Sequence, residues 1–143
     1  MTATRILDKK GYQIFTISEA ASIKDVIHEL AKRKIGALIV TDVAGEGVGI
    51  ISERDVIHQL SKNFDTARTA GDAMTRTITK CSLDDTDNEI MERMDKAQVR
   101  HLPVQHAGKL VGIISARDVI NLRIEKLNEL MQDIRVQAAR QKA

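Results

Sequence analysis

Apolar residues in the first half of the chain alternate between short continuous runs and helical spacing. The continuous runs, which predict buried strands, lie at residues 14–17, 37–40 and 48–51. Apolar positions between residues 23 and 33 share one helical face, and Ser22 followed by Asp25 is typical of a helix start. A second helix is expected over residues 53–62. The first half is therefore predicted to run strand, helix, strand, strand, helix.

The second half shows the same order of patterns. Ile78 and Cys81 bracket an opening strand, and Thr86 with Glu89 is predicted to cap the helix that carries Ile90, Met91 and Met94 inward. Further strands are expected at residues 101–104 and 110–114, followed by a helix from Arg117. Each half thus predicts one small subdomain of the same design.

The duplication is visible in the letters themselves. Residues 48–57 read VGIISERDVI, and residues 111–120, which lie 63 positions later, read VGIISARDVI. Roughly 60 residues bury too little surface to be stable alone, so we expect the two halves to pack together by pseudo-two-fold symmetry. Residues 64–76 are interpreted as the linker between them.

The C-terminal segment carries apolar residues at another spacing. Ile120, Ile124, Leu127, Met131, Ile134 and Ala138 are separated alternately by four and three residues, which is the seam of a coiled coil. One interpretation is an amphipathic helix that packs on its own module. The other is a helix that packs at a subunit interface or docks a partner.

Composition narrows the class of protein. Lys and Arg number 22 against 20 Asp and Glu, and the two signs are interleaved along the chain, which argues against nucleic-acid binding on electrostatic grounds. No apolar run approaches a membrane span, the first residues lack the pattern of a signal peptide, and the single cysteine, Cys81, excludes an internal disulfide. We expect a cytoplasmic protein with no membrane association.

The repeated Ser-x-Arg-Asp places a hydroxyl, a cation and a carboxylate at a strand-to-helix junction in both halves. Ser and Asp at such a junction can serve simply as helix caps. Their duplication beside matching strands favours a pair of ligand sites instead. No nucleophile–base pair, paired catalytic carboxylates or metal-ligand spacing is present in the sequence, so we expect neither catalytic nor metal-binding residues.

These motifs, GIISERD and HLPV followed by GKLVGIISARD, resemble a pair of CBS domains, also called a Bateman module. The resemblance implies an α/β fold of the α+β type, with tandem β-α-β-β-α domains packed by pseudo-two-fold symmetry and a C-terminal helical extension. The boundaries expected on this basis are residues 1–63 for the first repeat with its N-terminal segment, 64–76 for the linker, 77–125 for the second repeat and 126–143 for the amphipathic extension.

The resemblance also assigns roles to the repeated motif. Asp55 and Asp118 would bind ribose hydroxyls, since a carboxylate can accept hydrogen bonds from a vicinal diol. Ser52 and Ser115 would contact phosphate or ribose at the start of the following helix, where backbone N–H groups favour an anion. Arg54 and Arg117 would clamp phosphate or form salt bridges across a dimer.

Further site residues follow from the same resemblance. Arg100 and His101 lie where some nucleotide-sensing relatives carry phosphate-binding basic residues, and their counterparts in the first half, Gly36 and Ala37, carry no charge. The Asp118 site, or a shared phosphate position near Arg100, is therefore expected to bind more tightly. The adenine slots are expected to include Phe15, Thr16 and Ala37 in one site, and Thr79, Lys80 and Leu102 in the other. Pro103 lies next to Leu102, at a position where the family often has proline.

The expected function is therefore regulatory. The two repeats would sense an adenosine-containing ligand, such as AMP, ADP, ATP, NAD(H) or S-adenosylmethionine, and signal to an unidentified partner protein. The resemblance further implies a homodimer, no catalytic activity and no required cofactor other than the adenine nucleotide ligand. The alternative is a protein-interaction or dimerisation module whose cleft is unoccupied.

Overall fold

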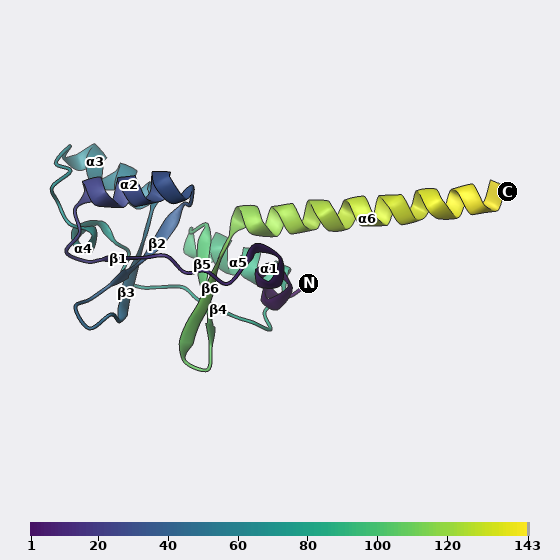
Figure 1. Ribbon diagram of the computed structural model, residues 1–143, viewed down its shortest axis with the longest axis horizontal. Helices are drawn as coiled ribbons and strands as arrows, with labels where there is room; N and C mark the ends of the chain where they lie inside the picture. Colours follow the sequence, from purple (N-terminus) through teal and green to yellow (C-terminus); the bar gives the residue numbers. More distant parts are fainter. Residues whose placement is uncertain (143) are drawn as a thin grey trace. The chain divides into compact units, whose positions relative to one another are not determined.

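The computed structural model describes residues 1–142, and these residues form two compact units. The first-repeat unit comprises Gln13–Thr79. The second-repeat unit comprises Met1–Tyr12 together with the chain from Lys80 onward. Each unit combines one three-stranded sheet with helices, which confirms the mixed α/β class predicted from the sequence (Figure 1).

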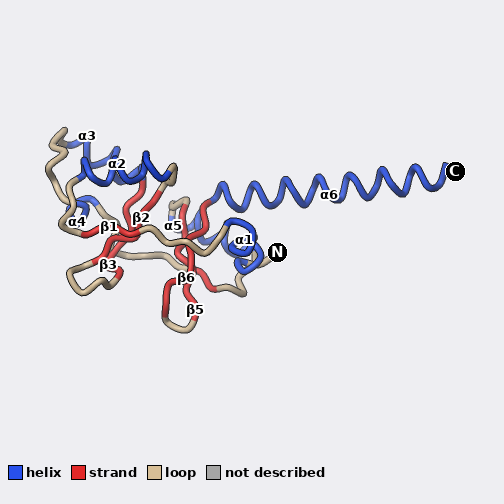
Figure 2. The backbone as a smooth tube through the Cα atoms, in the orientation of Figure 1, coloured by secondary structure: helices blue, strands red, loops and turns tan. Residues whose placement is uncertain are grey.

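The first-repeat unit follows the predicted order of elements, with one additional short helix. Its elements are β1 (Thr16–Ser18), α2 (Ile23–Arg33), β2 (Ala37–Thr41), β3 (Gly47–Ser52), α3 (Glu53–Lys62) and α4 (Ala70–Ala73). The strand order is β1-β2-β3, with β1 parallel to β2 and β2 antiparallel to β3. Figure 2 shows these strands in red and the helices in blue. The Ser22 side chain accepts a hydrogen bond from the Asp25 N–H at 3.1 Å, as the helix-start signal predicts.

The second-repeat unit contains the equivalent elements and two more helical segments. They are α1 (Ala3–Lys10), β4 (Cys81–Ser82), α5 (Asp87–Ala97), β5 (His101–His106), β6 (Lys109–Ser115) and α6 (Ala116–Lys142). The sheet order is β4-β5-β6 with the same parallel and antiparallel pairings. The opening strand β4 begins only at Cys81, so Ile78, Thr79 and Lys80, which were expected in this strand, lie before it.

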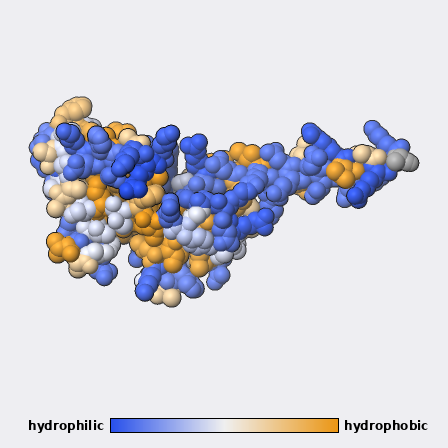
Figure 3. Space-filling model, viewed as in Figure 1, coloured by the Kyte–Doolittle hydropathy of each residue, from blue (hydrophilic) through white to orange (hydrophobic). Residues whose placement is uncertain are grey.

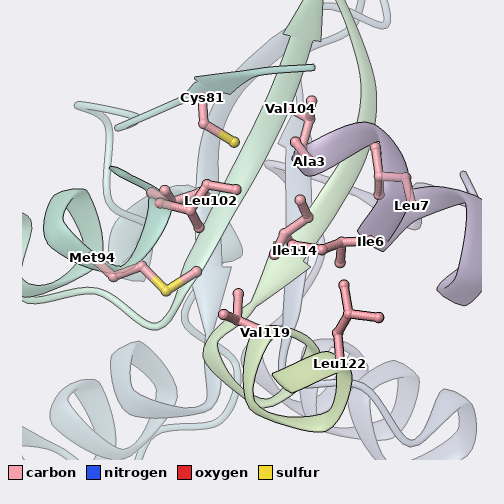
Figure 4. Packing of buried hydrophobic residues seen from close by; sticks show 11 residues of the cluster. Ala3, Ile6, Leu7, Cys81, Met94, Leu102, Val104, Ile114, Val119 and Leu122 are labelled. Carbon is pink, nitrogen blue, oxygen red and sulfur yellow. The ribbon is translucent and has the colours of Figure 1, made fainter. Parts of the chain in front are cut away.

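Each unit has its own hydrophobic core, built from the apolar faces that the sequence pattern predicts. The first-repeat core includes Ile23, Val26, Leu38, Val40 and Ile51. In the second-repeat unit, side chains from α1, the sheet and α6 converge (Figure 4); this core includes Leu7, Ile90, Leu102, Val104, Ile114, Val119 and Leu122. Two separate clusters make each repeat a packing unit of its own.

The N-terminal segment belongs to the second-repeat unit, which corrects the assignment of residues 1–63 to one repeat. The backbone N–H groups of Ala3 and Thr4 donate to the carbonyls of Asp85 and Leu83 at 2.9 and 3.1 Å. Leu7 is fully buried in the core of that unit. These contacts connect residues about eighty positions apart, and no local pattern encodes them.

The short helix α4 makes hydrogen bonds within the first-repeat unit that are equivalent to those of α1 within the second-repeat unit. The N–H groups of Ala70 and Gly71 donate to the carbonyls of Ala21 and Glu19 at 2.7 and 2.9 Å. A shift of 67 residues relates Thr2-Ala3 to Thr69-Ala70. Each unit therefore includes one such segment: in the first-repeat unit it follows α3, and in the second-repeat unit the start of the chain supplies it.

Glycines of the repeated strand make room for these two segments. A Cβ at Gly112 would lie 2.8 Å from a Leu7 methyl carbon, and a Cβ at Gly49 would lie 2.6 Å from the sulfur of Met74. Both positions therefore exclude larger side chains for a packing reason. The glycine of each VGII motif thus leaves space for a side chain from outside the five-element repeat, Met74 beside Gly49 and Leu7 beside Gly112.

The C-terminal extension is not a separate element, since α6 is a single helix that includes the expected boundary at residues 125 and 126. Val119 and Leu122 are its buried residues, and the apolar positions from Ile124 to Ile134 are exposed. The interpretation of an amphipathic helix that packs on its own module is therefore wrong for the part of α6 beyond Leu122. No helix within residues 1–142 is long and apolar enough to cross a membrane.

Candidate functional site

The topology of each sheet gathers the predicted site residues at one end. In the first-repeat unit, β1 and β2 are parallel and β3 is antiparallel, so the starts of β1 and β2 lie beside the end of β3. Ala37 is the register partner of Ser52, and Thr16 pairs with Ile39 two residues further along β2. The N-terminus of α3 follows at the same end, where free backbone N–H groups favour an anion.

Ser52 and Asp55 form a reciprocal capping box at this point. The Asp55 Oδ2 atom accepts from the Ser52 N–H at 2.8 Å and from its hydroxyl at 3.0 Å, while Ser52 Oγ accepts from the Asp55 N–H at 3.3 Å. The other carboxylate oxygen, Oδ1, accepts from the Thr75 hydroxyl at 3.2 Å. The capping interpretation of this motif is therefore confirmed, and ligand binding by the same residues stays a prediction.

The second-repeat unit repeats the arrangement with a different neighbour. The Ser115 N–H donates to Asp118 Oδ2 at 2.8 Å, and the Asp118 N–H donates to Ser115 Oγ at 3.0 Å. Lys10 at the end of α1 donates to the same Oδ2 and to the Ile113 carbonyl, both at 2.6 Å. The cap and the Lys10 ion pair thus use the same carboxylate oxygen, Oδ2.

Arg100 and His101 lie directly beside this second cap. The Ala116 N–H donates to the Arg100 carbonyl at 2.8 Å, and His101 is the register partner of Ser115. The equivalent contact in the first-repeat unit joins the Glu53 N–H to the carbonyl of Gly36, which has no side chain. Arg100 and His101 thus give this end of the second sheet basic side chains that Gly36 and Ala37 do not give the first.

The residues expected in the adenine slots lie at the strand starts but differ in exposure. Ala37, Leu102 and Pro103 are buried, whereas Thr16 and Lys80 are exposed. The boundary between the two units falls between Thr79 and Lys80, so these two neighbours belong to different units. The buried residues can contribute mainly backbone atoms to an adenine slot, whereas the exposed residues can present their side chains to a ligand.

The two arginines of the repeated motif, Arg54 and Arg117, are exposed in the first turns of α3 and α6. Phe15, at the start of the first sheet, stacks against another cation instead: the Arg33 guanidinium lies 4.3 Å from the centre of its ring. This contact places a positive charge at the edge of the first sheet that the sequence analysis did not assign to the site.

Sequence reasoning also missed Lys10 and Thr75, the two residues that hydrogen-bond the motif carboxylates from outside the repeat. Both lie in the segments that precede the repeats, and the shared Thr-Ala dipeptides of α1 and α4 are the signal that could have identified those segments. A hollow of about 170 Å³ lies beside Lys10 and Asp118, between α1 and the start of α6. This volume is below that of usual small-molecule sites, so the hollow by itself does not enclose a nucleotide.

Comparison with known proteins agrees with the duplicated architecture. The family model described as CBS domain matches residues 8–62 and again residues 70–125. The chain belongs to the CBS-domain family. A solved structure of a CBS-domain containing protein from Agrobacterium tumefaciens is 34% identical, covers 86% of this chain and 99% of its own, and superposes with a TM-score of 0.83.

Two further CBS structures were solved with adenosine compounds. A CBS domain protein from Pyrobaculum aerophilum, complexed with AMP, is 26% identical, with a TM-score of 0.73 and coverage of 82% of this chain and 89% of its own. A CBS domain pair in complex with 5′-methylthioadenosine and S-adenosyl-L-methionine is also 26% identical, with a TM-score of 0.77 and coverage of 88% and 98%.

The curated relatives are mostly longer than this CBS pair. The chain spans 71% of an uncharacterised 17.7 kDa protein of Acidianus ambivalens, which is 29% identical over 118 residues. It spans 22% of an inosine-5′-monophosphate dehydrogenase of Nitrosopumilus maritimus, and only the CBS part of that enzyme is matched. Similarity to that dehydrogenase therefore concerns its CBS part alone.

Proposed function

We propose that this CBS pair is a regulatory module that binds an adenosine-containing ligand through Asp118, with a second, weaker site at Asp55. The observation that carries the proposal is the set of groups at the end of the second sheet: the Asp118 carboxylate at a helix N-terminus, with Lys10, Arg100 and His101 on elements that meet there. A carboxylate suits ribose hydroxyls, and the surrounding cations and helix N-terminus suit a phosphate or another anion.

The difference between the two carboxylates supports unequal sites. Both oxygens of Asp55 accept hydrogen bonds inside the unit, with Thr75 on Oδ1, whereas the hydrogen bonds to Asp118 fall on Oδ2. A ribose hydroxyl at Asp118 therefore adds a hydrogen bond, while one at Asp55 has to displace or share the Thr75 hydroxyl. Binding of AMP and of S-adenosyl-L-methionine by CBS relatives supports the same ligand class.

Regulation would follow from linkage. A ligand that favours one arrangement of the two repeats shifts the population of that arrangement, and a partner protein or a second copy of the chain that prefers it binds more tightly. We propose accordingly a homodimeric, non-catalytic and cytoplasmic module that reports ligand concentration to another protein. The competing function is an interaction module in which Ser52, Asp55, Ser115 and Asp118 serve only as helix caps.

Calorimetric titration of the full chain with AMP, ATP, NAD, S-adenosylmethionine and 5′-methylthioadenosine distinguishes these functions. At least one ligand should bind the unaltered chain, and Asp118→Asn should weaken that binding about tenfold or more through loss of a charge-assisted hydrogen bond. The matched control is Asp72→Asn, since Asp72 forms the same reciprocal capping box with Thr69 on α4. This control should bind the ligand like the unaltered chain.

Two results would contradict the proposal. If none of the five ligands binds at millimolar concentration, the interaction module becomes the better description. If a ligand binds but Asp118→Asn and Asp72→Asn are indistinguishable, the Ser-x-x-Asp motif acts as a cap and binding lies elsewhere.

A further inference from the structure

The outer part of α6 exposes a continuous apolar face. Large hydrophobic side chains that are between 47% and 58% exposed follow α6 from the part that carries the core residues Val119 and Leu122 outward: Ile120, Ile124, Leu127, Leu130, Met131 and Ile134. Figure 3 shows hydrophobic side chains interspersed along α6 among hydrophilic ones. Isolated exposed residues need no explanation, but a line of six on one helix is larger than the usual apolar surface patch.

These residues form a seam with the geometry of a helix pair. Positions 120, 124, 127, 131, 134 and 138 alternate in spacing by four and three, so they occupy the a and d positions of consecutive heptads. Leu130 flanks the seam, and Glu125, Lys126, Glu129 and Asp133 lie on the remaining faces. Most of the stability of a helix in a protein comes from packing of its apolar face, so a partner on the seam would stabilise this part of α6.

We propose that α6 pairs in antiparallel orientation with α6 of a second copy of this chain. Centring the pair on residue 129 matches every seam residue with a seam residue of the second copy: Ile120 with Ala138, Ile124 with Ile134, and Leu127 with Met131. The seam is self-complementary, because each a position meets a d position over its whole length. The contact is isologous and closes as a dimer.

Two observations favour the antiparallel over the parallel orientation. In the antiparallel pair Leu130 meets Leu130 of the second copy, whereas in a parallel pair it would face Arg135. The last turns of α6 carry Arg135, Arg140 and Lys142 and no acidic residue after Asp133. A parallel pair would bring both basic ends together, and the antiparallel pair separates them by the length of the seam.

The apolar area suits a second copy of the chain. The six exposed side chains offer on the order of 600 Å² per copy, so two copies bury about 1,200 Å², the lower limit of specific interfaces. We therefore expect a reversible dimer whose mass depends on protein concentration. The inference concerns residues 120–142, which lie outside the Ser-x-x-Asp motifs, and it does not rest on nucleotide binding.

Engineered cysteines test the orientation in the full chain without any ligand. Asn128 lies next to the two-fold axis of the antiparallel pair, so Asn128→Cys should oxidise to a covalent dimer of twice 15.9 kDa. Ile124 is about 15 Å from its own copy in that arrangement, from the helical rise over ten residues, but adjacent to it in a parallel pair. Ile124→Cys should therefore stay uncrosslinked, as should the unaltered chain, whose single thiol is buried.

Sedimentation velocity over a range of protein concentrations tests the pairing itself. Leu127→Glu should reduce the dimer fraction at least fivefold, while Lys126→Glu, the same charge on a neighbouring polar position, should leave it unchanged. Crosslinking of Ile124→Cys without Asn128→Cys would overturn the antiparallel orientation. An unaltered sedimentation profile in Leu127→Glu, or absence of crosslinking in both cysteine variants, would overturn the proposal.

Discussion

Replacing Gly112 by alanine should destabilise the second-repeat unit, and shortening Leu7 should relieve much of that effect. The added Cβ would lie 2.8 and 2.9 Å from the two methyl carbons of Leu7, which is too close for the native packing. Overpacking of this kind costs about 1–3 kcal/mol, reduced by about 0.4–1 kcal/mol because alanine restricts the unfolded chain. We expect Gly112→Ala to lower the free energy of unfolding by about 1–2 kcal/mol.

Leu7→Ala alone should cost more, because it opens a cavity in the core of the same unit. Leu7 is fully buried, and leucine-to-alanine changes at such positions cost about 2–5 kcal/mol. In the double variant the new methyl group at residue 112 occupies part of that cavity. The double variant should therefore be more stable than the sum of the single effects predicts, with a coupling energy of about 1–2 kcal/mol.

Urea-induced unfolding followed by circular dichroism gives the four free energies of this cycle. The matched control is Gly49→Ala, whose Cβ would meet the Met74 sulfur and the Thr75 carbonyl oxygen in the other unit. It should show no coupling to Leu7→Ala. Additive effects of Gly112→Ala and Leu7→Ala, within about 0.5 kcal/mol, would refute the placement of α1 on the second repeat.

Three other predictions concern the same unit. Burial, with a smaller effect of Asp85, raises the pKa of the Cys81 thiol to about 11, so the folded protein should not react with a thiol reagent at pH 8 and should react fully in denaturant. Burial alone would raise the pKa of Asp87, but the Arg123 guanidinium and the N-terminal ammonium outweigh it and lower that pKa. This stabilisation is present above the unfolded pKa of about 3.9 and is lost as the pH falls through the lower folded value. The free energy of unfolding should therefore fall less steeply with decreasing pH in Arg123→Gln than in the unaltered chain. An unchanged slope would exclude the ion pair of Asp87 and Arg123 as its source. Lys10→Met should cost about 1 kcal/mol in urea unfolding and Lys9→Met less than about 0.5 kcal/mol, because Lys10 is less exposed and also donates to a carbonyl, whereas equal costs would contradict the role given to Lys10.

The local elements of both repeats could be predicted from the sequence, since strand and helix periodicity depends on neighbouring residues. Helices α2 and α3 were predicted at residues 23–33 and 53–62, and the structure has them at Ile23–Arg33 and Glu53–Lys62. The two identical VGII strands and the Ser-x-x-Asp junctions also follow directly from the sequence. Duplication strengthens each prediction, because the same local pattern occurs twice.

Long-range packing decided the rest. The sequence alone does not determine on which unit α1 packs, because that choice depends on hydrogen bonds to Leu83 and Asp85 and on the space above Gly112. The ion pair of Lys10 with Asp118 joins residues 108 positions apart, so no spacing rule could identify it. The heptad seam of α6 was visible as a pattern, but only the tertiary structure established that its own unit leaves the seam exposed, because coverage depends on where the core of that unit ends.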